Sequence, residues 1–472
     1  MTTTDRPRPP SVERVLAAAR PAARDRDPDA VLAVAREVVV GERARLAAGD
    51  SPRDVDALGA DVVAALEAFD GPAGPAGEGP AAGPTRVINA TGVVVHTNLG
   101  RAAWARAAIE AARRAAEGSI LLELDRSTGR RGARYRAGEE HLVALTGADD
   151  ALVVTNNAAA IALGVGLAGR GGGVAVSRGE LVEIGGGVRI PEILRRAGVR
   201  LVEVGTTNRT RVADFEAALA DPKARIRVVL RVHPSNFVQT GFVESPDPGE
   251  LAETAHRHGA IVVDDLGSGA LLPTERVGLA HEPMPRERLA AGADLVTFSG
   301  DKLVGGPQTG LIVGRRELVA RLRRDPLARA MRPDKTILAA IAATLALYRA
   351  GRAMAEIPVW RMLSTPVDAL RARAEALVAT LPDGSSEVVE LESTVGGGSL
   401  PGGVLPSIGI GLAAASGRDA ADLLAELRTG EPCVVARIER DVVVLDLRTV
   451  TPGDDPALAA AIARALDAAA GS

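Results

Sequence analysis

Lysine is almost absent from this chain of 472 residues, which contains only Lys223, Lys302 and Lys335. Arginine supplies the other 53 of the 56 basic residues. An arginine guanidinium stays protonated, whereas a lysine amine can lose its proton and attack a carbonyl carbon. A lysine retained in such a composition is therefore a candidate for covalent chemistry that arginine cannot perform.

Aromatic residues, cysteine and long apolar runs are also scarce. Aromatics make up 2% of the chain, so its cores must be built from Ala, Val, Leu and Ile. The single Cys433 excludes an internal disulfide and is typical of a reducing compartment. No signal peptide or membrane-spanning run is visible, and we expect a cytoplasmic protein. The six histidines and one cysteine lack the spacing of metal ligands, so we expect no metal.

The domain organisation follows from length and local composition. A chain of this size is too long for one core. Residues 1–70 have helical periodicity, with Ser11 and Asp29 as expected N-caps. Residues 71–84 (GPAGPAGEGPAAGP) form the expected linker. We expect a large domain over 85–345 and a smaller α/β domain over 346–472.

Within the large domain, apolar β-branched runs alternate with Ala/Leu/Arg-rich helical segments. This alternation predicts an α/β fold with a mostly parallel sheet. The runs are continuously apolar, as expected of strands buried on both faces. The expected strands are 151–154, 174–176, 201–204, 227–232, 260–264 and 295–298.

Lys302 lies in the segment FSGDKLVGGPQTG (298–310), a polar, glycine-rich loop directly after one of these expected strands. An average lysine is a solvated surface residue. This setting instead favours a lysine that forms a Schiff base with pyridoxal 5′-phosphate. Such an enzyme also needs a carboxylate beside the pyridine nitrogen, which keeps the ring protonated and able to accept electrons. Asp265, at the end of a strand, is our choice for this role, with Asp264 as the alternative.

Three further strand ends supply candidate cofactor contacts. The turn before an expected helix, Asn156, Asn157 and Ala158, would offer free N–H groups to a phosphate. Ser299 could add a hydroxyl to the same phosphate. Asn236, in the segment HPSN (233–236), could donate a hydrogen bond to the phenolic oxygen of the cofactor.

Arginines suited to binding an oxyanion occur in three segments. Arg101 ends NLGR (98–101), and Arg134 and Arg136 belong to a run of five arginines in residues 126–136. Arg329 and Arg332 are spaced to share one face of a helix. Arginine is a fork-shaped ligand for phosphate-like anions. Because this chain uses arginine throughout, each one taken singly would more often be a surface residue.

Taken together, these segments resemble the bacterial selenocysteine synthases, the L-seryl-tRNA(Sec) selenium transferases. The resemblance is dense from about 90 to 350, weaker elsewhere, and collinear. It is carried by INATGVVVHTNLGRA (88–102), GARYRAGEEHLVALTGA (132–148), VVTNNAAA (153–160), SRGELVEIGGGVRIPE (177–192), EVGTTNRT (203–210), HPSNF (233–237), DLGSG (265–269), FSGDKLVGGPQTG (298–310) and PLARAMRPDK (326–335).

The resemblance implies a fold-type-I enzyme that uses pyridoxal phosphate, with seryl-tRNA(Sec) and selenophosphate as substrates. Water would be eliminated to leave a dehydroalanyl group, to which selenium adds. It implies that Lys302 binds the cofactor, and that the arginine candidates bind substrate. It also implies a cytosolic homo-oligomer, a ring of dimers forming a decamer, and an N-terminal domain that binds the tRNA.

Two alternatives use the same residues differently. The first is a lyase or eliminase acting on a free small amino acid, which would not need the helical module at 1–70. The second is a non-catalytic tRNA-binding protein, which would not need Lys302, Asp265 and Asn156 together. Residues 1–70 contain 10 arginines and 13 acidic residues, so tRNA binding there would depend on a local basic stripe.

The lysine assignment leads to a first prediction. Lys302→Arg should keep the charge and the fold but abolish the visible absorbance of the Schiff base, since a guanidinium cannot form an imine. Borohydride reduction followed by peptide mapping should place the pyridoxyl group on Lys302. A pyridoxyl group on Lys223 or Lys335 would contradict the assignment.

Overall fold

The computed structural model describes residues 8–68, 84–132, 134–184, 187–412 and 419–470. The chain divides into two units, Met1–Ile88 with Ala425–Val434, and Asn89–Leu424 with Val435–Ser472. All of the predicted linker except Pro84 lies outside the described residues.

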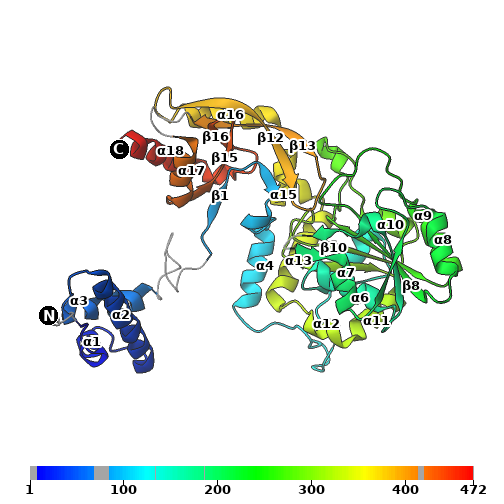
Figure 1. The fold of residues 1–472 in the computed structure, drawn as a ribbon, viewed down its shortest axis with the longest axis horizontal. Helices are drawn as coiled ribbons and strands as arrows, with labels where there is room; N and C mark the ends of the chain where they lie inside the picture. Colours follow the sequence, from blue (N-terminus) through cyan, green and yellow to red (C-terminus); the bar gives the residue numbers. More distant parts are fainter. Residues whose placement is uncertain (1–7, 69–83, 133, 185–186, 413–418, 471–472) are drawn as a thin grey trace, which may run out of the picture. The chain divides into compact units, whose positions relative to one another are not determined.

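The N-terminal segment is helical, as predicted (blue in Figure 1). Its helices are α1 (Val12–Ala19), α2 (Pro28–Ala48) and α3 (Val55–Ala68). Ser11 caps α1 as expected. Asp27 caps α2, so the prediction of Asp29 was wrong. Pro28 occupies the first helical position, where its missing N–H costs nothing, and the capping residue must precede it.

The three helices share a small apolar core that includes Val15, Val34, Leu58 and Val62. A buried carboxylate, Glu42, connects α2 to the segment before α3. It accepts hydrogen bonds from the Arg53 backbone N–H at 3.0 Å and from Arg53 Nε at 2.7 Å. The backbone hydrogen bond from Arg53 is the largest of the effects that lower the pKa of Glu42 to about 2. The module therefore has a core of its own and an internal ion pair.

The large domain is built on a seven-stranded sheet in the order β3-β11-β10-β9-β8-β4-β7. Only β11 runs antiparallel to its neighbours, so the predicted mostly parallel sheet is confirmed. All six predicted strands are present, and β11 was missed. The strands are β3 (Asp150–Val154), β4 (Gly173–Ser177), β7 (Arg200–Val204), β8 (Ile226–Val232), β9 (Ile261–Gly267), β10 (Leu295–Ser299) and β11 (Gly310–Gly314).

Helices cover both faces of this sheet, which explains the continuously apolar strands. Along β3, Leu152 and Val154 pack in one apolar cluster, and Ala151 and Val153 pack in another on the opposite face. The helices are α4 (Arg106–Ala116), α5 (Ala137–Thr146), α6 (Asn157–Gly166), α7 (Ile190–Arg196), α8 (Val212–Ala220), α9 (Pro248–Arg257), α10 (Pro285–Ala290), α11 (Arg316–Arg324), α12 (Pro326–Ala330), α13 (Lys335–Arg349), α14 (Ala353–Glu356) and α15 (Pro358–Ser364).

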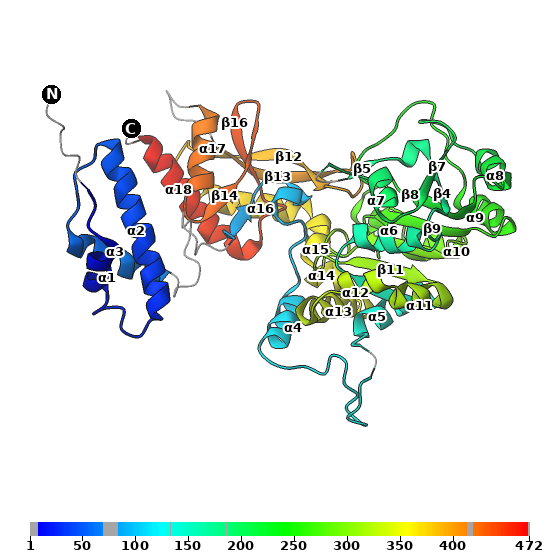
Figure 2. The same cartoon turned by 60° about the horizontal axis from the view of Figure 1, so that its bottom comes forward.

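A second sheet, in the order β15-β16-β13-β12-β2, forms the C-terminal part. Its strand β2 comes from residues before the large sheet and pairs in parallel with β12. Figure 2 shows β12 and β13 as a long hairpin. The elements are β2 (Val93–Val95), β12 (Ser386–Gly396), β13 (Val404–Leu412), β15 (Arg437–Glu439), β16 (Val442–Asp446), α16 (Val367–Val378), α17 (Ala420–Thr429) and α18 (Asp455–Ala470). Two short sheets pair β1 (Val87–Asn89) with β14 (Cys433–Val435), and β5 (Glu183–Ile184) with β6 (Val188–Arg189).

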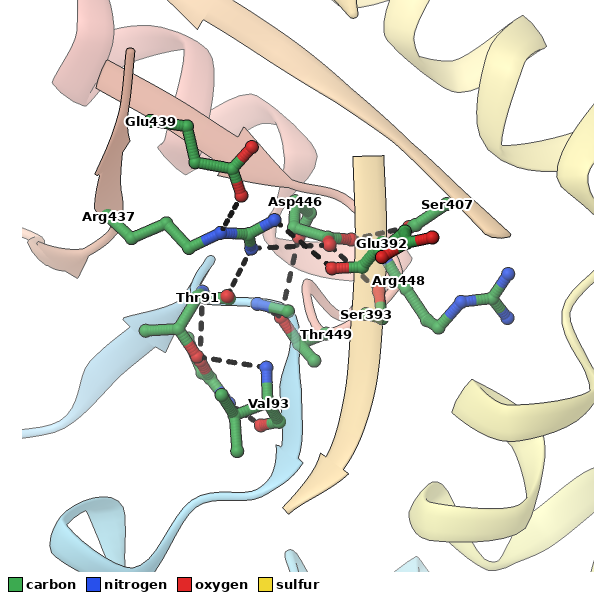
Figure 3. Close-up of polar contacts among 12 residues, drawn as sticks. Thr91, Val93, Glu392, Ser393, Ser407, Arg437, Glu439, Asp446, Arg448 and Thr449 are labelled. Atoms are coloured by element: carbon green, nitrogen blue, oxygen red, sulfur yellow. Dashed lines mark hydrogen bonds and ion pairs between the residues drawn. The ribbon is translucent and has the colours of Figure 1, made fainter. Parts of the chain in front are cut away.

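A fully buried carboxylate, Asp446, ties β2 into this second sheet (Figure 3). It accepts hydrogen bonds from Ser393 Oγ at 2.8 Å and from Ser407 Oγ at 2.6 Å. Arg437 lies 3.4 Å from the same carboxylate and also donates to the Thr91 carbonyl oxygen. Gly92, at φ 76°, has no room for a Cβ beside Asp446. The INATG motif is thus a turn fitted around a buried ion pair.

We predict that Asp446→Ala lowers the free energy of unfolding by about 3 kcal/mol or more. It leaves two buried hydroxyl groups without their acceptor and removes the buried one of the two carboxylates that pair with Arg437. Denaturant unfolding monitored by circular dichroism measures the change. Glu439→Ala is the matched control, because Glu439 also pairs with Arg437 but is exposed, and we expect it within about 0.5 kcal/mol of wild type. Equal losses in the two variants would contradict the role of Asp446.

Candidate active site

A cavity of about 260 Å³ opens where β3, β8, β9 and β10 end at the carboxyl edge of the large sheet. Ligands of open α/β sheets bind at this edge. Of the residues predicted from the sequence, the cavity brings together Arg101, Asn156, Asn157, Ala158, Asn236, Asp265, Ser299 and Lys302.

Lys302 follows β10 and its amine lies inside the cavity. Nζ donates a hydrogen bond to the Gly398 carbonyl oxygen at 3.3 Å. Burial is the main cause that lowers the pKa of Lys302, and the Arg101 charge adds to it, while Asp265 and Asp301 oppose it. A lowered pKa makes the neutral amine more available for imine formation. Of the other lysines, Lys223 is exposed and Lys335 donates to the Gly118 carbonyl oxygen.

Asp265 is buried at the end of β9, on the cavity side of the strand. Its Oδ1 accepts hydrogen bonds from Asn157 Nδ2 at 2.7 Å and from Thr297 Oγ1 at 2.8 Å. Desolvation raises the pKa of Asp265, and both hydrogen bonds and the Lys302 charge act against that rise. With Oδ1 occupied, Oδ2 is the oxygen left to contact a ring nitrogen.

Asp264, the alternative carboxylate, does not line the cavity. Its side chain lies near Arg231 at 3.8 Å and near Arg288 at 3.6 Å. Successive side chains of a strand point to opposite faces, so Asp264 and Asp265 cannot both face the cofactor site. The geometry favours Asp265.

The N-terminus of α6 borders the cavity. Asn156 caps the helix, and its Oδ1 accepts the Ala159 N–H at 2.9 Å. As the first residues of the helix, Asn157 and Ala158 have N–H groups without an intrahelical acceptor. The Asn157 side chain donates its hydrogen bond to Asp265, so the backbone N–H of Asn157 is the group that fits a phosphate. Ser299 lies buried on the same wall.

Arg101 enters the cavity from the segment after β2. Its Nη1 donates to Asp301 Oδ2 at 2.7 Å, and its backbone N–H donates to the His96 carbonyl oxygen at 2.9 Å. The backbone has φ 64°, a left-handed conformation that costs a residue with a Cβ about 1 kcal/mol or more. Tertiary contacts therefore hold Arg101 against a local preference, as is common at functional sites.

Several cavity residues were not singled out from the sequence. His233, Ser235 and Gln308 line the cavity. Thr297 contributes indirectly, by donating a hydrogen bond to Asp265. His233 and Ser235 follow β8, so their strand-end position was a usable signal. Thr297 lies within a buried strand and carried no such signal. Asn236, which was predicted, donates its side-chain N–H to the Glu183 carbonyl oxygen at 2.8 Å.

Three predicted substrate arginines lie in a second cavity that does not include Lys302. Arg134, Arg136 and Arg332 line it, together with Arg323 and carboxylates that pair with them. Glu123 pairs with Arg134 at 2.8 Å and with Arg332 at 3.4 Å. Glu139 and Asp150 pair with Arg136 and Arg323.

Arg329 lies exposed on α12. The prediction that Arg329 and Arg332 share a helical face was wrong, because α12 ends at Ala330. Pro333 explains this ending, since the residue before a proline is disfavoured in helical conformation.

The described residues contain no cluster of His, Cys, Asp or Glu that could hold a metal. Within the same residues, no helix is both long and apolar enough to cross a membrane.

Comparison with known proteins identifies the family. The model of the family described as L-seryl-tRNA selenium transferase (SelA) matches residues 87–451. The chain belongs to the L-seryl-tRNA selenium transferase family. Two relatives are named L-seryl-tRNA(Sec) selenium transferase. The one from Moorella thermoacetica is 48% identical over 389 residues, covering 81% of this chain and 82% of its own length. The one from Rhizobium meliloti is 46% identical over 372 residues, covering 77% and 79%.

The fold is also found in a solved structure, that of a D-glucosaminate-6-phosphate ammonia-lyase. It aligns with a TM-score of 0.59 and 24% identity, covering 82% of this chain and 97% of the lyase. The likeness concerns the fold alone. The predicted α/β fold of type I is confirmed, and family and fold together support pyridoxal phosphate as the cofactor.

The residues of the cavity fit this cofactor. Its wall offers a buried amine, a buried carboxylate with one open oxygen, and a helix N-terminus with two free N–H groups. These match the aldehyde, the pyridine nitrogen and the phosphate of pyridoxal phosphate.

Thr297→Val tests the support of Asp265. A hydrogen bond to an ionised carboxylate lowers its pKa, so its removal should raise the pKa of Asp265. The pH below which the protein loses affinity for the cofactor should therefore rise by about one unit. Absorbance titrations of the cofactor across the pH range measure this. Thr344→Val is the control, since that buried threonine bonds only the Ala340 carbonyl oxygen of its own helix. A similar shift in both variants would contradict the prediction.

Proposed function

We propose that this protein converts seryl-tRNA(Sec) to selenocysteinyl-tRNA(Sec), with pyridoxal phosphate as cofactor and selenophosphate as selenium donor. The observation that carries the proposal is the pairing of Lys302 and Asp265 in one buried cavity of a chain from this family. Since its substrate is an aminoacyl-tRNA, we place the protein in the cytoplasm.

The bound cofactor supplies an electron sink for the bond that breaks at the seryl Cα. Lys302 would hold the cofactor, and its amine, once released from it, could take the Cα proton and return it to the departing β-hydroxyl, which leaves as water. The selenium of selenophosphate would then add to the β-carbon of the dehydroalanyl group while Cα regains a proton, and water would cleave the selenium–phosphorus bond to release phosphate. Asp265 would keep the ring nitrogen protonated, and the start of α6 with Ser299 would hold the phosphate of the cofactor.

The arginines are proposed to bind the oxyanion of the selenium donor. Arg101 already faces the Lys302 cavity. Arg134, Arg136 and Arg332 line a separate cavity, and Arg329 lies outside both. If they serve the reaction, they would do so at the active site of a neighbouring subunit. We therefore also propose a homo-oligomer, with a ring of dimers as its form.

The N-terminal helices are proposed to bind the tRNA. Their small core is self-contained. Exposed arginines such as Arg20 and Arg43 offer contacts to phosphate, although acidic residues outnumber arginine in 1–70. We therefore expect the tRNA to contact only a small part of the surface of these helices.

The decisive experiment is to incubate the purified protein with seryl-tRNA(Sec) and selenophosphate, and to identify the amino acid released from the tRNA. We expect selenocysteine with the intact chain. Without residues 1–84 we expect no conversion but unchanged cofactor absorbance, because the removed module does not contribute to the cavity. Deamination of free serine with no change to the tRNA-bound amino acid would favour the alternative lyase. A protein that binds tRNA but no cofactor would support the non-catalytic alternative.

A further inference from the structure

Phe242 is the most exposed of the large apolar side chains in the described residues, with 82% of its surface accessible. Phe215 and Phe298 are fully buried, as expected in a chain so poor in aromatics. Single exposed apolar residues are common on protein surfaces. The surroundings of this ring nevertheless distinguish it from an incidental one.

Phe242 belongs to one of two loops that are hydrogen-bonded to each other. They follow β7 and β8, so both lie at the carboxyl edge of the sheet, where the Lys302 cavity opens. Asn208 Nδ2 donates to the Phe242 carbonyl oxygen at 2.7 Å, and the Glu244 N–H donates to the Asn208 carbonyl oxygen at 2.9 Å. Arg211 makes two hydrogen bonds of 2.9 Å to Glu244. These hydrogen bonds hold together the two loops from which the ring projects.

A cation accompanies the ring. The Arg209 guanidinium carbon lies 5.7 Å from the centre of the Phe242 ring, within the range of a cation–π contact. Within the described part of the chain, no hydrogen bond or ion pair is formed by this guanidinium, and Arg209 is exposed. The nearby Glu244 is hydrogen-bonded to Arg211, and the Arg209 charge also helps to lower the pKa of Glu244. An exposed aromatic ring with an adjacent free guanidinium is suited to a nucleobase and its phosphate.

The loop after β8 begins in the active site. Asn236 lines the Lys302 cavity and is six residues from Phe242, a span of at most about 20 Å. In an aminoacyl-tRNA, the amino acid is esterified to the terminal ribose. When the seryl group occupies the cavity, the terminal nucleotides must therefore lie at its mouth.

We propose that Phe242 and Arg209 form a stacking site for an unpaired base at the 3′ end of the substrate tRNA. This inference rests on the proposed function and adds a contact surface near the catalytic cavity. The ring would stack on the base, and the guanidinium would contact a phosphate. Stacking on an aromatic ring tolerates any base, so the site would hold the end without reading its sequence.

The test combines a protein variant with a tRNA variant. Binding to uncharged tRNA(Sec) is measured for wild type and Phe242→Ala, using intact tRNA and tRNA that lacks its unpaired 3′-terminal nucleotides. We expect Phe242→Ala to weaken binding of the intact tRNA about 5- to 100-fold and to leave binding of the shortened tRNA within about twofold. Phe242→Trp should retain binding, and Arg209→Ala should reduce both affinity and salt dependence.

Two controls accompany the measurement. Ile438→Ala removes an exposed apolar side chain from β15 and should change neither affinity. Cofactor absorbance of Phe242→Ala should match wild type, which shows that the cavity is intact.

Four outcomes would overturn the proposal. Equal weakening with both tRNAs would assign Phe242 a structural role, and no weakening with either would leave the ring without a part in tRNA binding. A smaller oligomer in Phe242→Ala, measured by light scattering, would make the ring a subunit contact. If wild type bound neither tRNA, the proposed function itself would fail, and this inference with it.

Discussion

The active site depends on two opposite charges that are both removed from water, Lys302 and Asp265. Burial favours the neutral form of each group, since it lowers the pKa of the amine and raises that of the carboxyl. Each charge opposes this effect on the other, and Asn157 and Thr297 add hydrogen bonds to the carboxylate. These contacts favour the ionised carboxylate against desolvation, while burial favours the neutral amine. The arrangement needs strands β9 and β10 side by side. It also needs Asn157, at the start of the helix after β3, within hydrogen-bond distance of Asp265.

The second sheet completes this site. Asp446 holds the turn before β2, and β2 pairs with β12 so that Val95 lies beside Gly396. β2 is followed by the segment that carries Arg101, which lines the cavity. β12 is followed by the turn that contains Gly398, whose carbonyl oxygen accepts a hydrogen bond from Lys302. A Cβ at Gly398, which has φ 75°, would collide with the Lys302 amine. The C-terminal part of the chain thus contacts the Lys302 amine through the turn at Gly398, although the residues that line the cavity come from the rest of the chain.

Four of the arginines form ion pairs in the second cavity. In the second cavity, Arg136 and Arg323 share Glu139 and Asp150, and Arg134 shares Glu123 with Arg332. Such partly buried ion pairs fix loop positions through hydrogen-bond geometry. Arg101 differs from them, because it lines the Lys302 cavity and has a left-handed backbone conformation. Arg209 differs in another way, since it lies beside an exposed ring.

Local sequence patterns were sufficient for six of the seven strands of the large sheet and for the residues at strand ends. Apolar runs predict buried strands, parallel strands place their ends at one edge, and the scarcity of lysine marks Lys302. The sequence did not reveal β11, β12 or β13, or the support from Thr297, and it kept Asp264 as an alternative to Asp265. It also gave no sign that Phe242 is exposed or that Gly398 meets Lys302. These features depend on contacts between residues far apart in the chain, such as the 96 positions between Lys302 and Gly398. Periodicity and propensity act over a few residues, so only tertiary packing decides which distant groups meet.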